Sequence, residues 1–206
     1  MIKNRSRWLP ISLALASAQL GLLCESKVGG LPVSSSPIAV SQDGASLWVV
    51  NPDSDTVGKI DTASAALIDE IPVGDNPRTL ALTEHPGLHW LFVANQDSDS
   101  LSRINTASGK TKDLELPRGS APYGVALTPD SKLLLVTLER THQLAFVDPR
   151  TLKVEGMIPV SRTPRGIAVT ASGDRAYLSH FITFEPSNSS FITEIDIASR
   201  TVTRTI

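Results

Sequence analysis

A unit of about 42 residues recurs four times in this chain, and this repeat limits the fold more than any other feature. The repeats begin at Ser35, Pro77, Pro122 and Pro164, and their starts are separated by 42, 45 and 42 residues. Repeats of this length are typical of architectures in which each copy covers the apolar surface of the next. We therefore expect residues 35–206 to form one stacked array.

The residue pattern within each repeat predicts four short strands. The first is an aliphatic residue, an alanine and another aliphatic residue, followed by a turn rich in Gly, Pro and Asp. The second and third strands carry apolar residues on both faces, which indicates sheets covered on two sides. The third strand ends in a residue whose side-chain oxygen can cap the next turn: Asp61, Asn105, Asp148 and Asp196.

A four-stranded antiparallel unit that is apolar on both faces can bury them by radial stacking. We therefore predict an all-β fold, a β-propeller with about four blades. A β-sandwich is the alternative, but it gives no reason for one strand quartet to recur four times. The expected blades cover residues 35–76, 77–121, 122–163 and 164–206.

The strand LFVAN, the TPDSKL turn, the IDTAS and INTAS turns and the closing IPVG resemble the YVTN-type (YncE-like) β-propeller repeat. The resemblance covers residues 35–206, with departures at Leu138 and His180, where Asn is expected. It implies exported repeat proteins with varied ligands and rings of about seven blades. The resemblance therefore implies that the four blades form an incomplete ring or open arc, the front part of a longer polypeptide, with a compact four-bladed ring as the alternative. Within residues 19–34, Lys27–Ser34 resembles a closing strand.

The N-terminus has the features of a secretory signal peptide. Basic residues precede an apolar stretch that ends in the small triplet Ala16-Ser17-Ala18. We expect cleavage after Ala18 and a periplasmic or extracellular protein. The alternatives are an uncleaved anchor ending near Leu23 and a lipid on Cys24, and only these would attach the chain to a membrane.

Composition excludes several classes of protein. Hydrophobic residues make up 41% of the chain and charged residues 19%, a balance that excludes wholesale disorder. The 19 basic and 21 acidic residues include no basic block for binding nucleic acid. With a single cysteine and no CxxCH motif, the chain has neither a disulfide framework nor covalent c-type haem.

We expect the ligand-binding face to lie around the mouth of the axial channel. If the strands run from the inside outward, the turns into strand one and those between strands two and three share this face. Paired guanidinium groups beside amides can hold a carboxylate or phosphate, although solvated loop arginines are the alternative. The ligand is therefore a protein or a small anion, held by Asn51, Arg78, Asn95, Tyr123, Arg165 and His180.

Other polar groups favour structural roles, and we expect no metal and no other cofactor. Two DxD loops lack the further acid that a Ca²⁺ site needs, so they are interpreted as polar turns: Asp53, Asp55, Asp97 and Asp99. His85 and His89 flank Pro86 and Gly87, which prevent a helical zinc pair. The irregular loop Phe181–Ser190 either folds back on its blade or meets a partner.

The leading functional hypothesis is a non-catalytic binding platform for a protein, a small anion or a downstream domain. The chain has no GxSxG motif and no convincing catalytic histidine–carboxylate pair. Related propellers include lactonases, so a hydrolase using His180, Arg165 and Arg78 is one alternative. An accessory propeller of a haem-dependent oxidoreductase is another.

Overall fold

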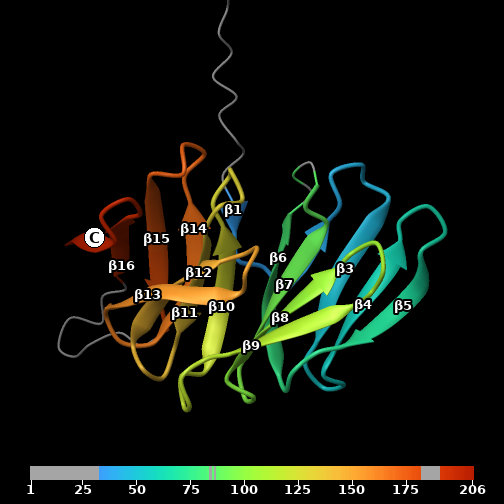
Figure 1. Cartoon of the computed structure of the whole chain (residues 1–206), viewed down its shortest axis with the longest axis horizontal. Helices are drawn as coiled ribbons and strands as arrows, with labels where there is room; N and C mark the ends of the chain where they lie inside the picture. Colours follow the sequence, from blue (N-terminus) through green and yellow to red (C-terminus); the bar gives the residue numbers. More distant parts are fainter. Residues whose placement is uncertain (1–32, 84, 86, 182–190) are drawn as a thin grey trace, which may run out of the picture.

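The computed structural model describes residues 33–83, 85, 87–181 and 191–206, and these residues form an all-β structure. Four antiparallel sheets stand side by side, as Figure 1 shows, and each contains the four strands of one sequence repeat, with the N-terminal strand Val33–Ser34 added to the fourth. The predicted propeller architecture is therefore confirmed. Each sheet is one blade, and its strands follow the chain order from the inner edge to the outer edge.

The strands of each blade have the following bounds. Blade one contains β2 (Ile38–Val40), β3 (Ser46–Asn51), β4 (Thr56–Asp61) and β5 (Ala66–Pro72). Blade two contains β6 (Pro77–Thr83), β7 (Trp90–Asn95), β8 (Ser100–Asn105) and β9 (Thr111–Glu115). Blade three contains β10 (Pro122–Leu127), β11 (Leu134–Leu138), β12 (Gln143–Asp148) and β13 (Lys153–Pro159). Blade four contains β14 (Pro164–Val169), β15 (Arg175–His180), β16 (Ile192–Asp196) and β17 (Thr201–Thr205).

Apolar side chains between neighbouring blades form the core. Three clusters of buried residues lie between blades one and two, two and three, and three and four. The alanine common to the inner strands faces the following blade, where Ala81 and Ala126 are buried. Ala168 occupies this position in blade four and is exposed, because no described residue packs against that face. The following blade therefore covers this position in blades two and three.

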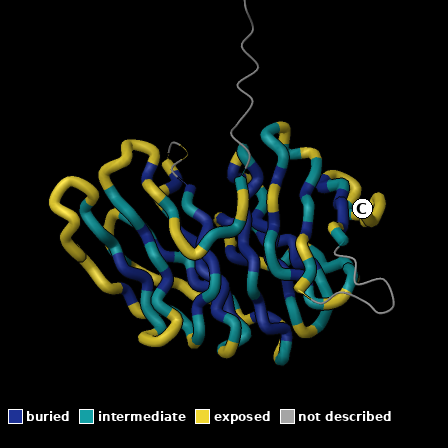
Figure 2. The backbone as a smooth tube through the Cα atoms, turned by 180° about the vertical axis from the view of Figure 1, so that it is seen from behind, coloured by how far each residue is buried: buried dark blue, intermediate teal, exposed yellow. Residues whose placement is uncertain are grey.

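The arc is not closed by the described residues, so both end faces contain exposed apolar side chains. Ile38 and Val40 of blade one are 46% and 58% exposed, whereas Leu80, the counterpart of Ile38 in blade two, is 1% exposed. Figure 2 shows the same gradient, with buried residues in the middle blades and exposed ones toward both ends.

The N-terminal segment lies at the centre of the arc. Strand β1 (Val33–Ser34) pairs with the inner edge of β14, and Ser36 then forms a single bridge to Leu80 of blade two (Figure 1). Of the segment Lys27–Ser34, which resembles the end of a fourth strand, the structure describes only Val33–Ser34, and these residues join blade four on its inner side. The outer position of that blade belongs to β17.

The residues expected to cap the turns after the third strand do so. Asp61 Oδ1 accepts the backbone N–H of Ser64 at 2.8 Å, and Asp196 Oδ1 accepts that of Ser199 at 2.9 Å. Hydrogen bonds from the hydroxyl and the backbone N–H of Ser64 hold the pKa of Asp61 below its ordinary value. The other two caps make equivalent bonds: Asn105 to Ala107 and Ser108, and Asp148 to Arg150 and Thr151.

The signal peptide 1–18, its alternative end at Leu23 and the lipidation candidate Cys24 all lie outside the described residues. The same holds for residues 182–190 of the irregular loop in blade four. In the part of the chain that the structure describes, no helix has the length and apolarity needed to cross a membrane.

Candidate functional site

The two sets of turns expected at the channel mouth do lie together. The first residue after the second strand donates its backbone N–H to the turn that leads into the inner strand of the same blade. Gln96 bonds Asn76 O, Glu139 bonds Ala121 O and Phe181 bonds Thr163 O, each at 3.0 Å. We call this surface of blades two to four the mouth face.

Three of the predicted residues meet on the mouth face. Arg78, Tyr123 and Arg165 are the second residues of the inner strands of blades two, three and four. The guanidinium carbons of Arg78 and Arg165 lie 5.8 and 4.7 Å from the centre of the Tyr123 ring. Arg165 is also 3.6 Å from the ring centre of Phe181, whose surface is 63% exposed. Guanidinium and aromatic groups therefore alternate across three blades.

Two threonines fix the spacing of this row. Thr79 Oγ1 of blade two donates to Tyr123 O at 2.7 Å and accepts the N–H of Val125. Thr137 Oγ1 of blade three donates to Arg165 O at 2.8 Å. Because each hydroxyl bonds the backbone of the next inner strand, it fixes the position of the mouth-face residue on that strand, Tyr123 or Arg165.

Two polar side chains that the sequence analysis did not select connect the arginines. Arg78 Nε donates to Gln96 Oε1 at 2.6 Å, and Gln96 Nε2 donates to Glu139 Oε2 at 2.6 Å. Arg165 then donates to Glu139 Oε1 from Nε at 2.9 Å and from Nη2 at 2.8 Å. The result is one continuous polar chain from blade two to blade four.

Their repeat position is a signal that could have identified Gln96 and Glu139. Both directly follow the second strand, whereas the sequence analysis selected the last residue of that strand. Successive side chains of a strand point to opposite faces, so a shift of one residue changes the surface that a side chain reaches.

The charges of the two arginines and Glu139 do not cancel. The side chains of Arg165 and Glu139 are only 28% and 12% exposed and neutralise each other. Arg78 forms no ion pair with any residue that the structure describes. The row thus retains one net positive charge beside two aromatic rings.

The remaining predicted residues serve neighbouring structure. Asn51 Nδ2 donates to Thr56 Oγ1 at 3.2 Å, which ties β3 to β4. Asn95 is fully buried and donates to Ser100 and Ser102, while its Oδ1 is buried without a partner among the described residues. The structure does not bring these two asparagines into the polar chain of the mouth face.

His180 is directed toward its own blade. Its Nδ1 lies 2.8 Å from Arg162 O, its Nε2 lies 2.9 Å from Thr193 Oγ1, and its ring stacks on Phe191. Burial lowers the pKa of His180, although its bond to the Arg162 carbonyl raises the pKa in part. Both ring nitrogens are therefore engaged away from Arg78.

The second acid of each DxD loop binds backbone groups, whereas Asp97 accepts the side-chain amide of Asn76 at 2.9 Å. Asp55 Oδ1 accepts the N–H of Asn76 at 2.7 Å. Asp99 accepts those of Gly119 at 2.6 Å and Ala121 at 2.8 Å. Within the described ranges, no three His, Cys, Asp or Glu side chains are grouped so that they could hold a metal ion.

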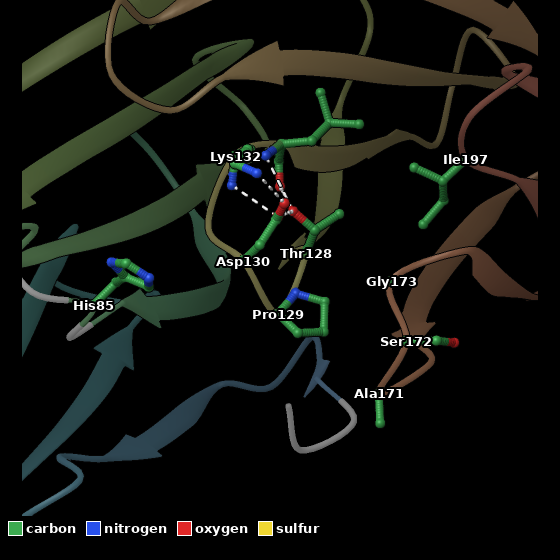
Figure 3. Close-up of a pocket in the computed structure, with 10 residues that line it drawn as sticks. His85, Thr128, Pro129, Asp130, Lys132, Ala171, Ser172, Gly173 and Ile197 are labelled. Carbon is green, nitrogen blue, oxygen red and sulfur yellow. Dashed lines mark hydrogen bonds and ion pairs between the residues drawn. The ribbon is translucent and has the colours of Figure 1, made fainter. Parts of the chain in front are cut away.

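Two hollows lie away from this row. An apolar groove of about 640 Å³ follows the inner strands β2, β6 and β10. A second pocket, of about 500 Å³, lies among turns of blades two, three and four (Figure 3). Its carboxylate, Asp130, already accepts Thr128 Oγ1 and pairs with Lys132 at 3.2 Å, as the dashed lines show.

A family described as "Lactonase, 7-bladed beta-propeller" matches residues 24–126, half of the chain. Comparison with proteins of curated function finds no match.

Similar solved structures include Kuenenia stuttgartiensis hydrazine synthase, with a TM-score of 0.74 and 23% identity over 90% of this chain and 51% of that one. Another is virginiamycin B lyase from Staphylococcus aureus, with a TM-score of 0.66 and 15% identity over 84% of this chain and 55% of that one. The chain therefore spans about half the length of these structures, and the likeness concerns the fold.

Proposed function

This chain belongs to the family of seven-bladed lactonase β-propellers, and we propose that its mouth face binds a small organic anion without converting it. Arg78 supports the proposal most directly, because it is a half-buried guanidinium that lacks a carboxylate partner among the described residues. Its Nε is committed to Gln96, which orients the group and leaves both Nη atoms for a ligand. Two parallel N–H donors suit a carboxylate.

The neighbouring groups favour binding over catalysis. The oxygens of Glu139 already accept three hydrogen bonds, two from Arg165 and one from Gln96. A carboxylate held in this way orients its donors instead of accepting a proton from a substrate. The two nitrogens of His180 are likewise engaged. Tyr123 and the exposed Phe181 ring offer apolar contact to the body of the ligand.

Calorimetric titration of the purified chain with citrate tests the proposal. We expect binding that weakens as salt rises, and at least about a tenfold loss of affinity in Arg78→Gln, since one charge-assisted pair contributes roughly 1.5–3 kcal/mol. Arg150→Ala, which removes an exposed cation from another turn, should leave affinity unchanged. Equal affinity in the wild type and Arg78→Gln would refute the assignment.

Lactone hydrolysis is the second candidate, and the family match favours it. Glu139 would take a proton from water as the water oxygen attacks the lactone carbonyl. Arg165 would stabilise the resulting oxyanion, and the ring C–O bond would then break, with the leaving oxygen receiving the proton. Acid release from γ-butyrolactone, followed in a pH-stat, should occur in the wild type and disappear in Glu139→Gln. Absence of turnover, or turnover that survives the substitution, excludes this candidate.

We also propose that the protein is exported and acts outside the cytoplasm. The basic start, the apolar stretch and the Ala16-Ser17-Ala18 triplet support this location.

A further inference from the structure

The turn that leads into blade four, residues 161–165, is held by two histidines. His142 Nδ1 lies 3.2 Å from the backbone nitrogen of Thr163, which donates to it. His180 Nδ1 lies 2.8 Å from the carbonyl oxygen of Arg162. The same turn contains Arg165, which blade three also holds through Thr137 Oγ1 and Glu139, so the bond from Thr163 to His142 is one of three contacts that position it.

His142 lies at the junction of blades three and four. The junctions of blades one and two and of blades two and three, which we call the other two joints, have an aspartate at this position. Asp55, Asp99 and His142 all follow the second strand of their blades and all have positive φ, at 54°, 48° and 57°. Each accepts a backbone N–H from the turn that leads into the next blade. The third joint thus performs the same task with a group of different acid–base chemistry.

The ring of His142 can accept the Thr163 N–H only while Nδ1 carries no proton. The same Nδ1 is 3.0 Å from the carbonyl oxygen of Glu139 in its own loop. A protonated Nδ1 donates to that carbonyl. It can no longer accept the N–H of Thr163, because both groups are then donors. The neutral ring that bonds Thr163 carries its proton on Nε2, and protonation of Nδ1 exchanges this bond between blades for a bond within blade three.

His180 does not switch in this way. Its Nδ1–H donates to Arg162 O in both charge states. Its Nε2 faces a hydroxyl, Thr193 Oγ1, which can either donate or accept. Acid therefore removes the bond from Thr163 to blade three, while the turn stays attached to its own blade at Arg162 and through the Phe181 N–H to Thr163 O.

We propose that His142 is a positioning residue that makes the mouth face pH-dependent, holding Arg165 in place when neutral and releasing its turn when protonated. This inference rests on the proposed function, because it concerns the regulation of the same site. At the junction of blades two and three, the pKa of Asp99 lies below its ordinary value, so that acceptor stays ionised across the range in which histidine titrates.

Several charged groups lie on the segments that meet at the His142 ring. Glu139 and Arg140 precede His142 in its loop, and Glu139 is already paired with Arg165. Arg162 and Arg165 flank Thr163 on the facing turn, and His180 of β15 contacts it from the other side. The end of β13, which bonds His142 O through Val160, contributes no charge.

Hydrogen exchange of the intact chain, measured by mass spectrometry at pH 7.5 and 5.5 and corrected for intrinsic rates, tests the release. We expect protection of the peptide covering residues 161–165 to fall by about fivefold or more in acid. The turns held by Asp55 and Asp99 serve as internal controls and should keep their protection. Unchanged protection of residues 161–165 would overturn the proposal.

His142→Asp places at this joint the acceptor used by the other two. Protection of residues 161–165 in this variant should become independent of pH between 5.5 and 7.5, whereas His142→Ala should lack protection at both values. A pH dependence that persists in His142→Asp refutes the role of His142. Because exchange needs no ligand, its outcome is separate from citrate binding. Where citrate binds, its affinity should fall in acid for the wild type only.

Discussion

Replacement of Asp99 by alanine tests how the blades are joined. The carboxylate accepts two backbone N–H groups from the turn that leads into blade three, at 2.6 and 2.8 Å. Burial raises the pKa of Asp99, but the hydrogen bonds from the N–H groups of Ala121 and Gly119 together lower it by more. The pKa of Asp99 therefore lies below its ordinary value. The side chain is therefore an ionised acceptor that connects blades two and three.

The expected loss of stability in Asp99→Ala follows from the number of hydrogen bonds that the carboxylate accepts. A hydrogen bond to a charged group contributes roughly 1.5–3 kcal/mol, and Asp99→Ala also leaves two N–H groups without their acceptor. Water reaches this partly exposed site and restores part of the loss, so we expect unfolding to become easier by about 2–4 kcal/mol. Asp55→Ala, which removes one such bond at the equivalent joint, should cost about half as much.

Urea unfolding of both variants, followed by tryptophan fluorescence, measures these differences. Asp99→Asn is the matched control, because it keeps one acceptor oxygen and should lie between the wild type and Asp99→Ala. A loss below about 0.5 kcal/mol in Asp99→Ala, or a larger loss in Asp55→Ala, would refute the view that these acids join the blades.

Three further predictions concern other parts of the molecule. Gly124→Ala should destabilise the chain by about 3 kcal/mol or more, because a Cβ there overlaps the carbonyl oxygen of Arg165; a smaller shift in the urea midpoint would contradict this packing. Expression of the whole chain in a Gram-negative host should give a periplasmic product that begins at Gln19 by mass spectrometry, and an intact cytoplasmic Met1 form would exclude the signal peptide. Burial lowers the pKa of His180 in the folded state below the ordinary 6.5, so the unfolded chain takes up this proton first. Stability should therefore fall as pH drops below about 6.5, and less steeply in His180→Asn; equal urea midpoints for both proteins at pH 7.5 and 5 would refute this.

Local patterns determined the blades. The aliphatic–Ala–aliphatic strands, the Gly- and Asp-rich turns and the caps such as Asp61 depend on residues close in sequence, so a single repeat specifies them. The spacing of the repeats also placed Arg78, Tyr123 and Arg165 at equivalent inner positions, and the structure brings these three together.

Only the tertiary structure decided which polar groups reach one another. Gln96 and Glu139 join the arginines because neighbouring blades bring their loops within hydrogen-bond distance, and no local pattern encodes that approach. The direction of His180 depends on Arg162 and Thr193, 18 and 13 residues away in sequence. The bond from Thr163 to His142 likewise spans 21 residues. Periodicity specifies which face of a strand a side chain occupies, whereas its partner depends on how the sheets stack.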